Sequence, residues 1–421
     1  METITKTEDL RVLCERLRQF DYVTVDTEFM RDSTYWPQLC LVQVCSPEFT
    51  DTGAAIDPLA DGIDLTPLFD LMQDESVIKV FHAARQDIEI FVHLNGKVPH
   101  PVFDTQVAAM VLGYGDQVGY ETLVNKVARK NVDKSMRFTD WSRRPLSSKQ
   151  ISYAISDVTH LRTVYENFHE RLSANDRAPW LFEEMERLTD PGIYTVDPAQ
   201  AWLRLKTRSN SPKFLAVAKA LGEWRETEAQ RKNLPRNRVL RDDTLLDIAA
   251  RQPLNENDLD KTRGVGRNFG ASKQGQAIID AIKAALAEPQ ENWPVPKVRN
   301  ELPAGIGPTV ELLKVLLKLC SEEKGVAQRL VASSDDLQNI AADDNADVPA
   351  LHGWRRELFG QYALRLKHGQ IALKLQNGEV ALVELATVLE TAPETATDAE
   401  AVTGAEAAAV VKIEADADAE V

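Results

Sequence analysis

Two acidic residues separated by a single residue, Asp26 and Glu28, are the first residues whose spacing could support chemistry. They lie in segment 22–29, where β-branched and aromatic residues alternate with other types, a pattern that predicts a strand. Alternate side chains of a strand share one face, so the two carboxylates lie side by side. Such a pair repels by roughly 4 kcal/mol at about 4 Å in an effective dielectric of about 20. It needs a cation or a bound proton, unless the strand is an exposed edge strand with solvated acids.

Two further acids and a tyrosine occupy positions where α/β proteins gather ligands. Asp87 follows the predicted strand 77–82 and lies in the first turn of the next predicted helix, at the carboxyl end of a strand. Tyr153 and Asp157 are four residues apart in the predicted helix 147–169, so they share one helix face. Each of these residues could also have a purely structural role. Asp87 could simply complement the helix dipole, and Tyr153 could be a buried tyrosine beside a solvated Asp157.

Four carboxylates that converge on one point suit metal binding better than acid–base chemistry, because their repulsion raises their pKa values. Oxygen-only ligands select Mg²⁺ or Mn²⁺ over zinc. Two such ions about 4 Å apart could hold the attacking and leaving oxygens of an in-line phosphodiester displacement. The Tyr153 hydroxyl, with an unperturbed pKa of about 10, could orient the attacking water without fully deprotonating it. The expected metal ligands are Asp26, Glu28, Asp87 and Asp157, and these four together with Tyr153 are the expected catalytic residues.

Cations and aromatic residues are interleaved in a predicted loop, residues 134–146. This mixture suits single-stranded nucleic acid, since cations contact phosphates and aromatic rings stack on bases. An ordinary surface loop whose tryptophan fills the core would have the same composition. A second turn, residues 263–267, combines glycines that permit close backbone approach with flanking arginines. The candidate substrate contacts are Phe29, Gln86, Lys134, Arg137, Trp141, Arg144, Arg263 and Arg267; Phe29 and Gln86 could equally be packing residues.

Composition indicates a soluble protein of several domains. The chain has 421 residues, 43% hydrophobic and 27% charged, and it has no apolar run of about 18 residues that would predict a transmembrane helix. The net charge is −16, but residues 201–290 hold 17 basic and 11 acidic residues, a local balance of +6. Such a basic middle permits a nucleic-acid partner. The four cysteines lack metal-site spacing, so we expect reduced thiols in a cytoplasmic protein.

The order of the predicted elements divides the chain into three domains. Strands and helices mix in the first part, whereas helical patterns alone follow, including one long helix predicted over residues 354–376. The tail is rich in alanine and acids, nine against one lysine, and is expected to be disordered. The predicted segments are an α/β domain 1–190, a linker 191–206, a helical domain 207–290, a Pro-rich linker 291–303, a second helical domain 304–385 and the acidic tail 386–421.

Three short motifs resemble those of the DEDD exonuclease superfamily in its tyrosine-containing subclass. They are Val25-Asp26-Thr27-Glu28-Phe29, the segment His82 to Asp87, and Tyr153 with Asp157 four residues later. The loop 134–146 and the helical segments that follow are similar to those of the ribonuclease D family. The resemblance implies an α/β ribonuclease H-like domain, with a mixed sheet flanked by helices, followed by two small all-α domains. The first would be a nucleic-acid-binding HRDC domain, and the second a degenerate HRDC-like copy.

The same resemblance implies a function. It is a 3′-to-5′ exoribonuclease that trims structured RNA such as tRNA precursors and releases nucleoside 5′-monophosphates by two-metal-ion hydrolysis. A monomeric cytoplasmic enzyme without a membrane partner is expected. The residues alone argue only for metal-dependent phosphodiester hydrolysis. A DNA 3′–5′ exonuclease of proofreading or helicase-associated type is the alternative, although no polymerase or helicase segment is present. A non-catalytic RNA-binding scaffold is a third possibility, against which the complete set of acids counts.

Overall fold

The computed structural model describes residues 3–48, 53–207, 209–295 and 303–385. The acidic tail 386–421 and most of the Pro-rich linker 291–303 lie outside the described residues. The described residues form two compact units. The first takes its described residues from segments 1–105, 124–166 and 183–299, and the second from segments 106–123, 167–182 and 300–385. The expected α/β domain therefore contributes to both units.

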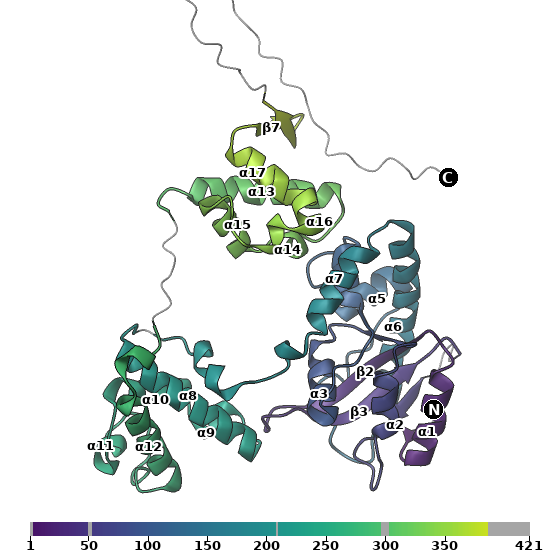
Figure 1. Cartoon of the computed structure of the whole chain (residues 1–421). Helices are drawn as coiled ribbons and strands as arrows, with labels where there is room; N and C mark the ends of the chain where they lie inside the picture. Colours follow the sequence, from purple (N-terminus) through teal and green to yellow (C-terminus); the bar gives the residue numbers. More distant parts are fainter. Residues whose placement is uncertain (1–2, 49–52, 208, 296–302, 386–421) are drawn as a thin grey trace, which may run out of the picture. The chain divides into compact units, whose positions relative to one another are not determined.

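A six-stranded mixed sheet forms the centre of the first unit, which confirms the predicted fold class. At its centre β2 pairs antiparallel with β3 and, on its other side, parallel with β5, while β3 pairs antiparallel with the short β4. The long strands β2 and β3 lie side by side (Figure 1). Two short strands, β1 and β6, were not predicted. In spatial order the strands are β1 (Thr3–Ile4), β4 (Ala54–Ile56), β3 (Gln38–Cys45), β2 (Tyr22–Met30), β5 (Ile78–Phe81) and β6 (Val102–Asp104).

Five helices accompany these strands in the sequence. In the first of them, Leu10, Leu13 and Leu17 are buried on one face. The helix after β5 begins after a sharp turn at Ala83, whose φ is 57°. The Asp104 carboxylate accepts hydrogen bonds from the backbone N–H groups of Ala83 and Ala84 at 3.0 and 2.9 Å. The helices are α1 (Thr7–Leu17), α2 (Thr66–Met72), α3 (Arg85–Asn95), α5 (Tyr120–Ala128) and α6 (Ser148–Ala174).

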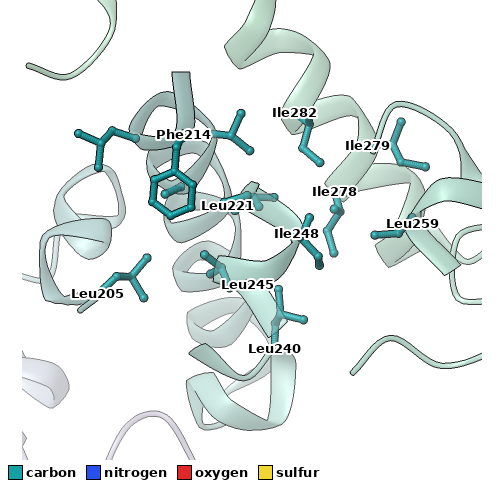
Figure 2. Close-up of a cluster of buried hydrophobic side chains, with 14 residues drawn as sticks. Leu205, Phe214, Leu221, Leu240, Leu245, Ile248, Leu259, Ile278, Ile279 and Ile282 are labelled. Carbon is teal, nitrogen blue, oxygen red and sulfur yellow. The ribbon is translucent and has the colours of Figure 1, made fainter. Parts of the chain in front are cut away.

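A helical module completes the first unit around its own apolar core (Figure 2). Phe214 and Leu221, from the longest helix of this module, pack with Ile248 and Ile278 from two other helices of the module. Leu205, from the expected linker, also joins this core, at the end of a 3₁₀ helix, Pro198–Arg204. The helices are α8 (Pro212–Lys232), α9 (Arg236–Val239), α10 (Asp242–Arg251), α11 (Glu256–Asp260) and α12 (Lys273–Ala287).

The second unit joins helices of the α/β region to the last helical segments. The Arg177 guanidinium donates hydrogen bonds to the carbonyl oxygens of Val111 and Gly325 at 3.0 and 3.1 Å, and Trp180 stacks on Trp354. No helix in the described part of the chain has the length and apolar character needed to cross a bilayer. The helices of this unit are α4 (Thr105–Val111), α13 (Gly307–Glu323), α14 (Gln328–Val331), α15 (Ser334–Ala342), α16 (Gly353–Arg355) and α17 (Gln361–Lys367), and α7 (Ala178–Leu188) has residues in both units.

The helix predicted over residues 354–376 is wrong beyond Lys367. A left-handed glycine, Gly369, follows the end of α17 and stops the helix. Two strands then form an antiparallel hairpin, β7 (Ile371–Gln376) and β8 (Glu379–Glu384). Asn377 and Gly378, both with positive φ, make the turn, since two-residue hairpin turns favour this pair.

Candidate active site

Three of the four predicted acids form a compact cluster. Asp26 and Glu28 lie on one face of β2, and Asp157 reaches them from α6. One carboxylate oxygen of each lies within 4.8 Å of the others. The alternation of β2 aligns the first two side chains, and the burial of α6 against the sheet brings in the third. The cluster has only oxygen donors, which is the ligand set that Mg²⁺ and Mn²⁺ prefer.

Asp87 lies beside this cluster but is not one of its three members. It is buried in the first turn of α3, and its Oδ1 accepts a hydrogen bond of 2.5 Å from the Thr27 hydroxyl. Thr27 lies between the two strand acids and therefore points to the other face of β2. Burial, and next the charge of Asp26, raise the pKa of Asp87. The structure thus places all four acids near β2 and clusters three of them.

The electrostatics of the metal-free cluster are unfavourable for four negative charges. Burial raises the pKa of Asp26 to about 6. Burial, and next the charge of Asp26, raise the pKa of Asp157 to about 8. Burial, and next the charges of Asp26, Asp157 and Asp87, raise the pKa of Glu28 to about 10. A bound divalent cation would offset this repulsion, so the cluster fits the group that the sequence implies.

Tyr153 lies one helical turn before Asp157, as predicted, and its hydroxyl is hydrogen-bonded to that carboxylate. Burial, and next the negative charges of Asp157, Glu28 and Asp26, raise the pKa of the phenol. Its ring packs against a core that contains Trp141, with the ring centroids 6.1 Å apart. The phenol therefore keeps its proton and can hold a water in place, but it is a poor base.

Two predicted substrate contacts in the loop 134–146 are corrected. Trp141 is 2% exposed and packs with Cys40, Leu41 and Ala154, so its ring cannot stack on a base. Arg144 donates two hydrogen bonds of 2.6 Å to the Asp57 carboxylate and others to the carbonyl oxygens of Trp141 and Cys40. With these donors occupied, Arg144 fastens the loop to the sheet. The sequence pattern did not reveal which cations and rings turn inward.

The same loop presents an aromatic ring that was not among the candidate site residues. Phe138 is 92% exposed, and the Arg137 guanidinium lies 5.4 Å from the centre of its ring. Burial and the neighbouring acids raise the pKa of Glu28, and the positive charge of Arg137 offsets a part of this rise, which places this part of the loop near the cluster. Lys134 is also exposed, and its carbonyl accepts a hydrogen bond from the Arg137 N–H. An exposed ring flanked by cations beside the acids is suited to stacking on a base.

Gln43 is a second residue that sequence reasoning missed. It lies directly opposite Asp26 in the β2–β3 ladder, so both side chains share one face. It is fully buried, and within the described residues neither its amide nitrogen nor its amide oxygen has a hydrogen-bond partner. A glutamine within the apolar strand Leu39–Cys45 was the available signal. Its amide is suited to bind a water or an ion at the cluster.

The remaining candidates divide between the sheet and the helical module. Phe29 is half-buried and follows a bulge in β2, and Gln86 is exposed in the first turn of α3. Arg263 and Arg267 are exposed on the turn after α11 in the helical module, so they do not belong to the acidic cluster. Gly264 adopts a φ of 82° there, which explains the glycine in this turn.

The fold and the acidic cluster define the class of protein. Residues 1–173 match the 3′–5′ exonuclease family, and residues 214–282 match the HRDC domain family. A ribonuclease D from Nitrobacter hamburgensis is 52% identical over 369 residues, which cover 87% of this chain and 95% of that protein. A ribonuclease D from Granulibacter bethesdensis is 51% identical over 366 residues, 87% and 92% of the two chains. The chain is a 3′–5′ exonuclease, and it belongs to the ribonuclease D family.

Solved structures agree with this assignment. The crystal structure of Escherichia coli RNase D, described as an exoribonuclease involved in structured RNA processing, is 28% identical. The similarity has a TM-score of 0.75 and covers 87% of this chain and 98% of that one. A protein from Bifidobacterium adolescentis is 21% identical, with a TM-score of 0.66 over 88% of this chain and 97% of that one, and shows the shared fold alone.

Proposed function

We propose that this chain shortens structured RNA, such as tRNA precursors, from the 3′ end and releases nucleoside 5′-monophosphates. The observation that carries the proposal is the cluster of Asp26, Glu28 and Asp157 next to the Tyr153 hydroxyl. Membership of the ribonuclease D family and the similarity to an exoribonuclease that acts in structured RNA processing support RNA as the substrate. The DNA exonuclease alternative has no comparable support among these relatives.

Two divalent ions, Mg²⁺ or Mn²⁺, are proposed to occupy the site. Asp26, Glu28 and Asp157 would hold them, with Asp87 beside the cluster as the proposed fourth ligand. When bound, such ions polarise the phosphodiester and stabilise the charge that develops on the attacking and leaving oxygens. Gln43, buried opposite Asp26, is proposed to hold a water of the site through its unpartnered amide.

The protein residues around the cluster would position the RNA end and the attacking water. Tyr153 keeps its proton and orients the water by a hydrogen bond, while its contact with Asp157 fixes the ring. Phe138 is proposed to stack on a nucleobase, and Arg137 and Lys134 to contact phosphates. Phe29 and Gln86, next to Glu28 and Asp87 in the sequence, are proposed to contact the terminal nucleotide.

The helical parts would supply general affinity for RNA. The domain boundaries are proposed as predicted: the exonuclease domain 1–190, the HRDC domain 207–290 and a degenerate HRDC-like domain 304–385. Arg263 and Arg267 are proposed to contact the RNA backbone, a contribution that salt weakens because counterions are released on binding. All cluster residues come from one chain, so a monomer suffices, and four buried free thiols suit a reducing cytoplasm.

Digestion of a tRNA precursor and of a DNA strand with the same sequence tests this function. Both substrates carry a 3′-terminal label and are incubated with Mg²⁺ or with a chelator. The proposal predicts labelled mononucleotide from the RNA with Mg²⁺, little from the DNA and none with the chelator. Equal rates on DNA would favour the alternative function, and chelator-resistant release would contradict metal-dependent chemistry.

A further inference from the structure

A basic pocket in the first unit has no assigned role. Its volume is about 340 Å³, and it lies among the loop between β2 and β3, the 3₁₀ helix Pro198–Arg204, helix α8 and segment 235–242. Four arginines and one aspartate supply the charged groups of its lining, which are Arg31, Arg204, Arg225, Arg236 and Asp242.

Directed hydrogen bonds hold the walls of this pocket together. The side-chain oxygen of Asn233 accepts from the backbone N–H groups of Tyr35 and Trp36 at 3.1 and 2.9 Å. The Tyr35 hydroxyl donates to the buried carboxylate of Glu226 and accepts from Arg236 at 3.0 Å. Because the tip of the loop and helix α8 are tied in this way, the pocket is a built feature of the unit.

Positive charge in the pocket exceeds what its acids neutralise. Arg31 pairs with Glu89 at 2.7 Å, Arg236 with Glu226 at 2.6 Å and Arg225 with Asp242 at 2.5 Å. Arg204 is exposed and forms no ion pair with any residue that the structure describes. With this guanidinium counted, four positive charges face three negative ones.

Arg225 provides the second observation that points to a ligand. Its side chain is 5% exposed, and its NH1 group donates to Asp242 and to the Leu240 carbonyl at 2.5 and 3.0 Å. Its Nε–H, in contrast, has no hydrogen-bond partner within the described part of the chain. An unpaired buried donor is costly, and an anion in the pocket would offset the positive charge of this guanidinium.

We propose that this pocket binds a phosphate group of the RNA backbone upstream of the 3′-terminal nucleotide, an inference that rests on the proposed function. Arg204 would donate to the phosphate oxygens, and the positive charge of the Arg225 guanidinium in the pocket lining would attract them. Arg31 follows Glu28 by three residues, so their Cα atoms are at most about 10 Å apart. The strand that carries the cluster thus leads directly to the pocket. A free nucleoside 5′-monophosphate shares the phosphate chemistry and is the other source to be distinguished.

Binding to the full-length chain with Asp26→Asn, in the presence of chelator, tests the pocket without cleavage. The probes are 5′-fluorescein RNA of twelve and of three nucleotides and, separately, AMP measured by calorimetry. The variants are Arg204→Glu, Arg204→Lys and, as a matched control, Arg238→Glu, an exposed arginine outside the pocket. Because the Arg204 side chain is exposed, the fold should be kept, which thermal unfolding verifies.

Arg204→Glu should weaken binding of the longer RNA roughly tenfold. The slope of log affinity against log salt concentration should decrease by the amount that about one phosphate contact contributes. Arg204→Lys should restore most of the affinity, whereas the three-nucleotide RNA and AMP should be unaffected. Loss of AMP binding alone would overturn the backbone assignment in favour of the mononucleotide. Unchanged RNA binding, or an equal loss with Arg238→Glu, would overturn the pocket as a phosphate site. None of these outcomes depends on cleavage, so failure of the proposed function would show separately in the digestion assay.

Discussion

The Thr27 hydroxyl donates a hydrogen bond of 2.5 Å to Oδ1 of Asp87, and this contact joins the centre of β2 to the first turn of α3. Thr27 lies between Asp26 and Glu28, so the strand that presents two acids on one face holds a third with the side chain between them. Because the threonine is buried, water cannot replace its hydroxyl. Thr27 is therefore a positioning residue for Asp87.

Thr27→Val should lower the rate of RNA digestion about tenfold, because a hydrogen bond to a charged group is worth roughly 1.5 kcal/mol or more. The metal concentration needed for half-maximal rate should rise, since Asp87 loses its orientation. Thr27→Ser should restore both values. A valine variant with the normal metal dependence would show that the hydroxyl serves packing alone.

Tyr153→Phe removes the hydroxyl but keeps the ring in its core. If the phenol orients the attacking water, kcat should fall roughly hundredfold, because a misplaced reactant can cost about that factor. Affinity for Mg²⁺, measured by calorimetry, should change little because the three clustered carboxylates remain. An unchanged kcat would contradict this role for Tyr153.

The metal-free chain should lose stability as pH rises. The pKa values of Asp26, Asp157 and Glu28 are raised to about 6, 8 and 10, whereas unfolded carboxyl groups titrate at about 4. The folded state therefore binds more protons than the unfolded state. The stability that these protons contribute is fully present below a pH of about 4 and is lost as pH rises through the three raised pKa values. In chelator, Tm should fall between pH of about 5 and 8.

Two comparisons identify the cluster as the cause of this pH dependence. Asp26→Asn combined with Asp157→Asn should flatten the decline in Tm, because two of the repelling charges are gone. Mg²⁺ should raise Tm more at the higher pH, since it competes with protons for the carboxylates. An identical decline in the double variant would assign the effect to other groups.

Arg144→Met should destabilise the fold without removing a substrate contact. Asp57 is 6% exposed, and it would be left as a buried carboxylate without its bidentate partner. Breaking such a pair costs about 3 kcal/mol, which urea unfolding can measure. Arg143→Met, at the exposed neighbouring position, should change the free energy of unfolding by less than about 0.5 kcal/mol.

Local patterns predicted the central part of the fold well. The alternation in β2 placed Asp26 and Glu28 on one face, and the four-residue spacing placed Tyr153 beside Asp157. The pairing of Gln43 with Asp26 depends on the register between two strands, which one strand's pattern does not contain. The short strands β1 and β6 are only two and three residues long, too short for a recognisable period.

The predictions failed at positions where tertiary packing determines whether a side chain is buried or exposed. Trp141 and Phe138 lie three residues apart in one loop, yet the first is in the core and the second is almost fully exposed. Arg144 donates its hydrogen bonds to Asp57, a residue far away in the sequence. The hairpin after α17 was missed because its apolar residues were read with a helical period, although Asn377-Gly378 is a recognised hairpin signal.

Release of the 3′-terminal nucleotide from labelled RNA, compared between the native chain and Asp26→Asn, shows whether the acidic cluster is the catalytic metal site. The native chain should release a nucleoside 5′-monophosphate in a reaction that depends on Mg²⁺. The variant should lose this activity because one carboxylate of the acidic cluster is replaced by a neutral amide. It should keep its fold and its affinity for RNA. Release at the native rate by Asp26→Asn would contradict the assignment of this cluster as the catalytic metal site.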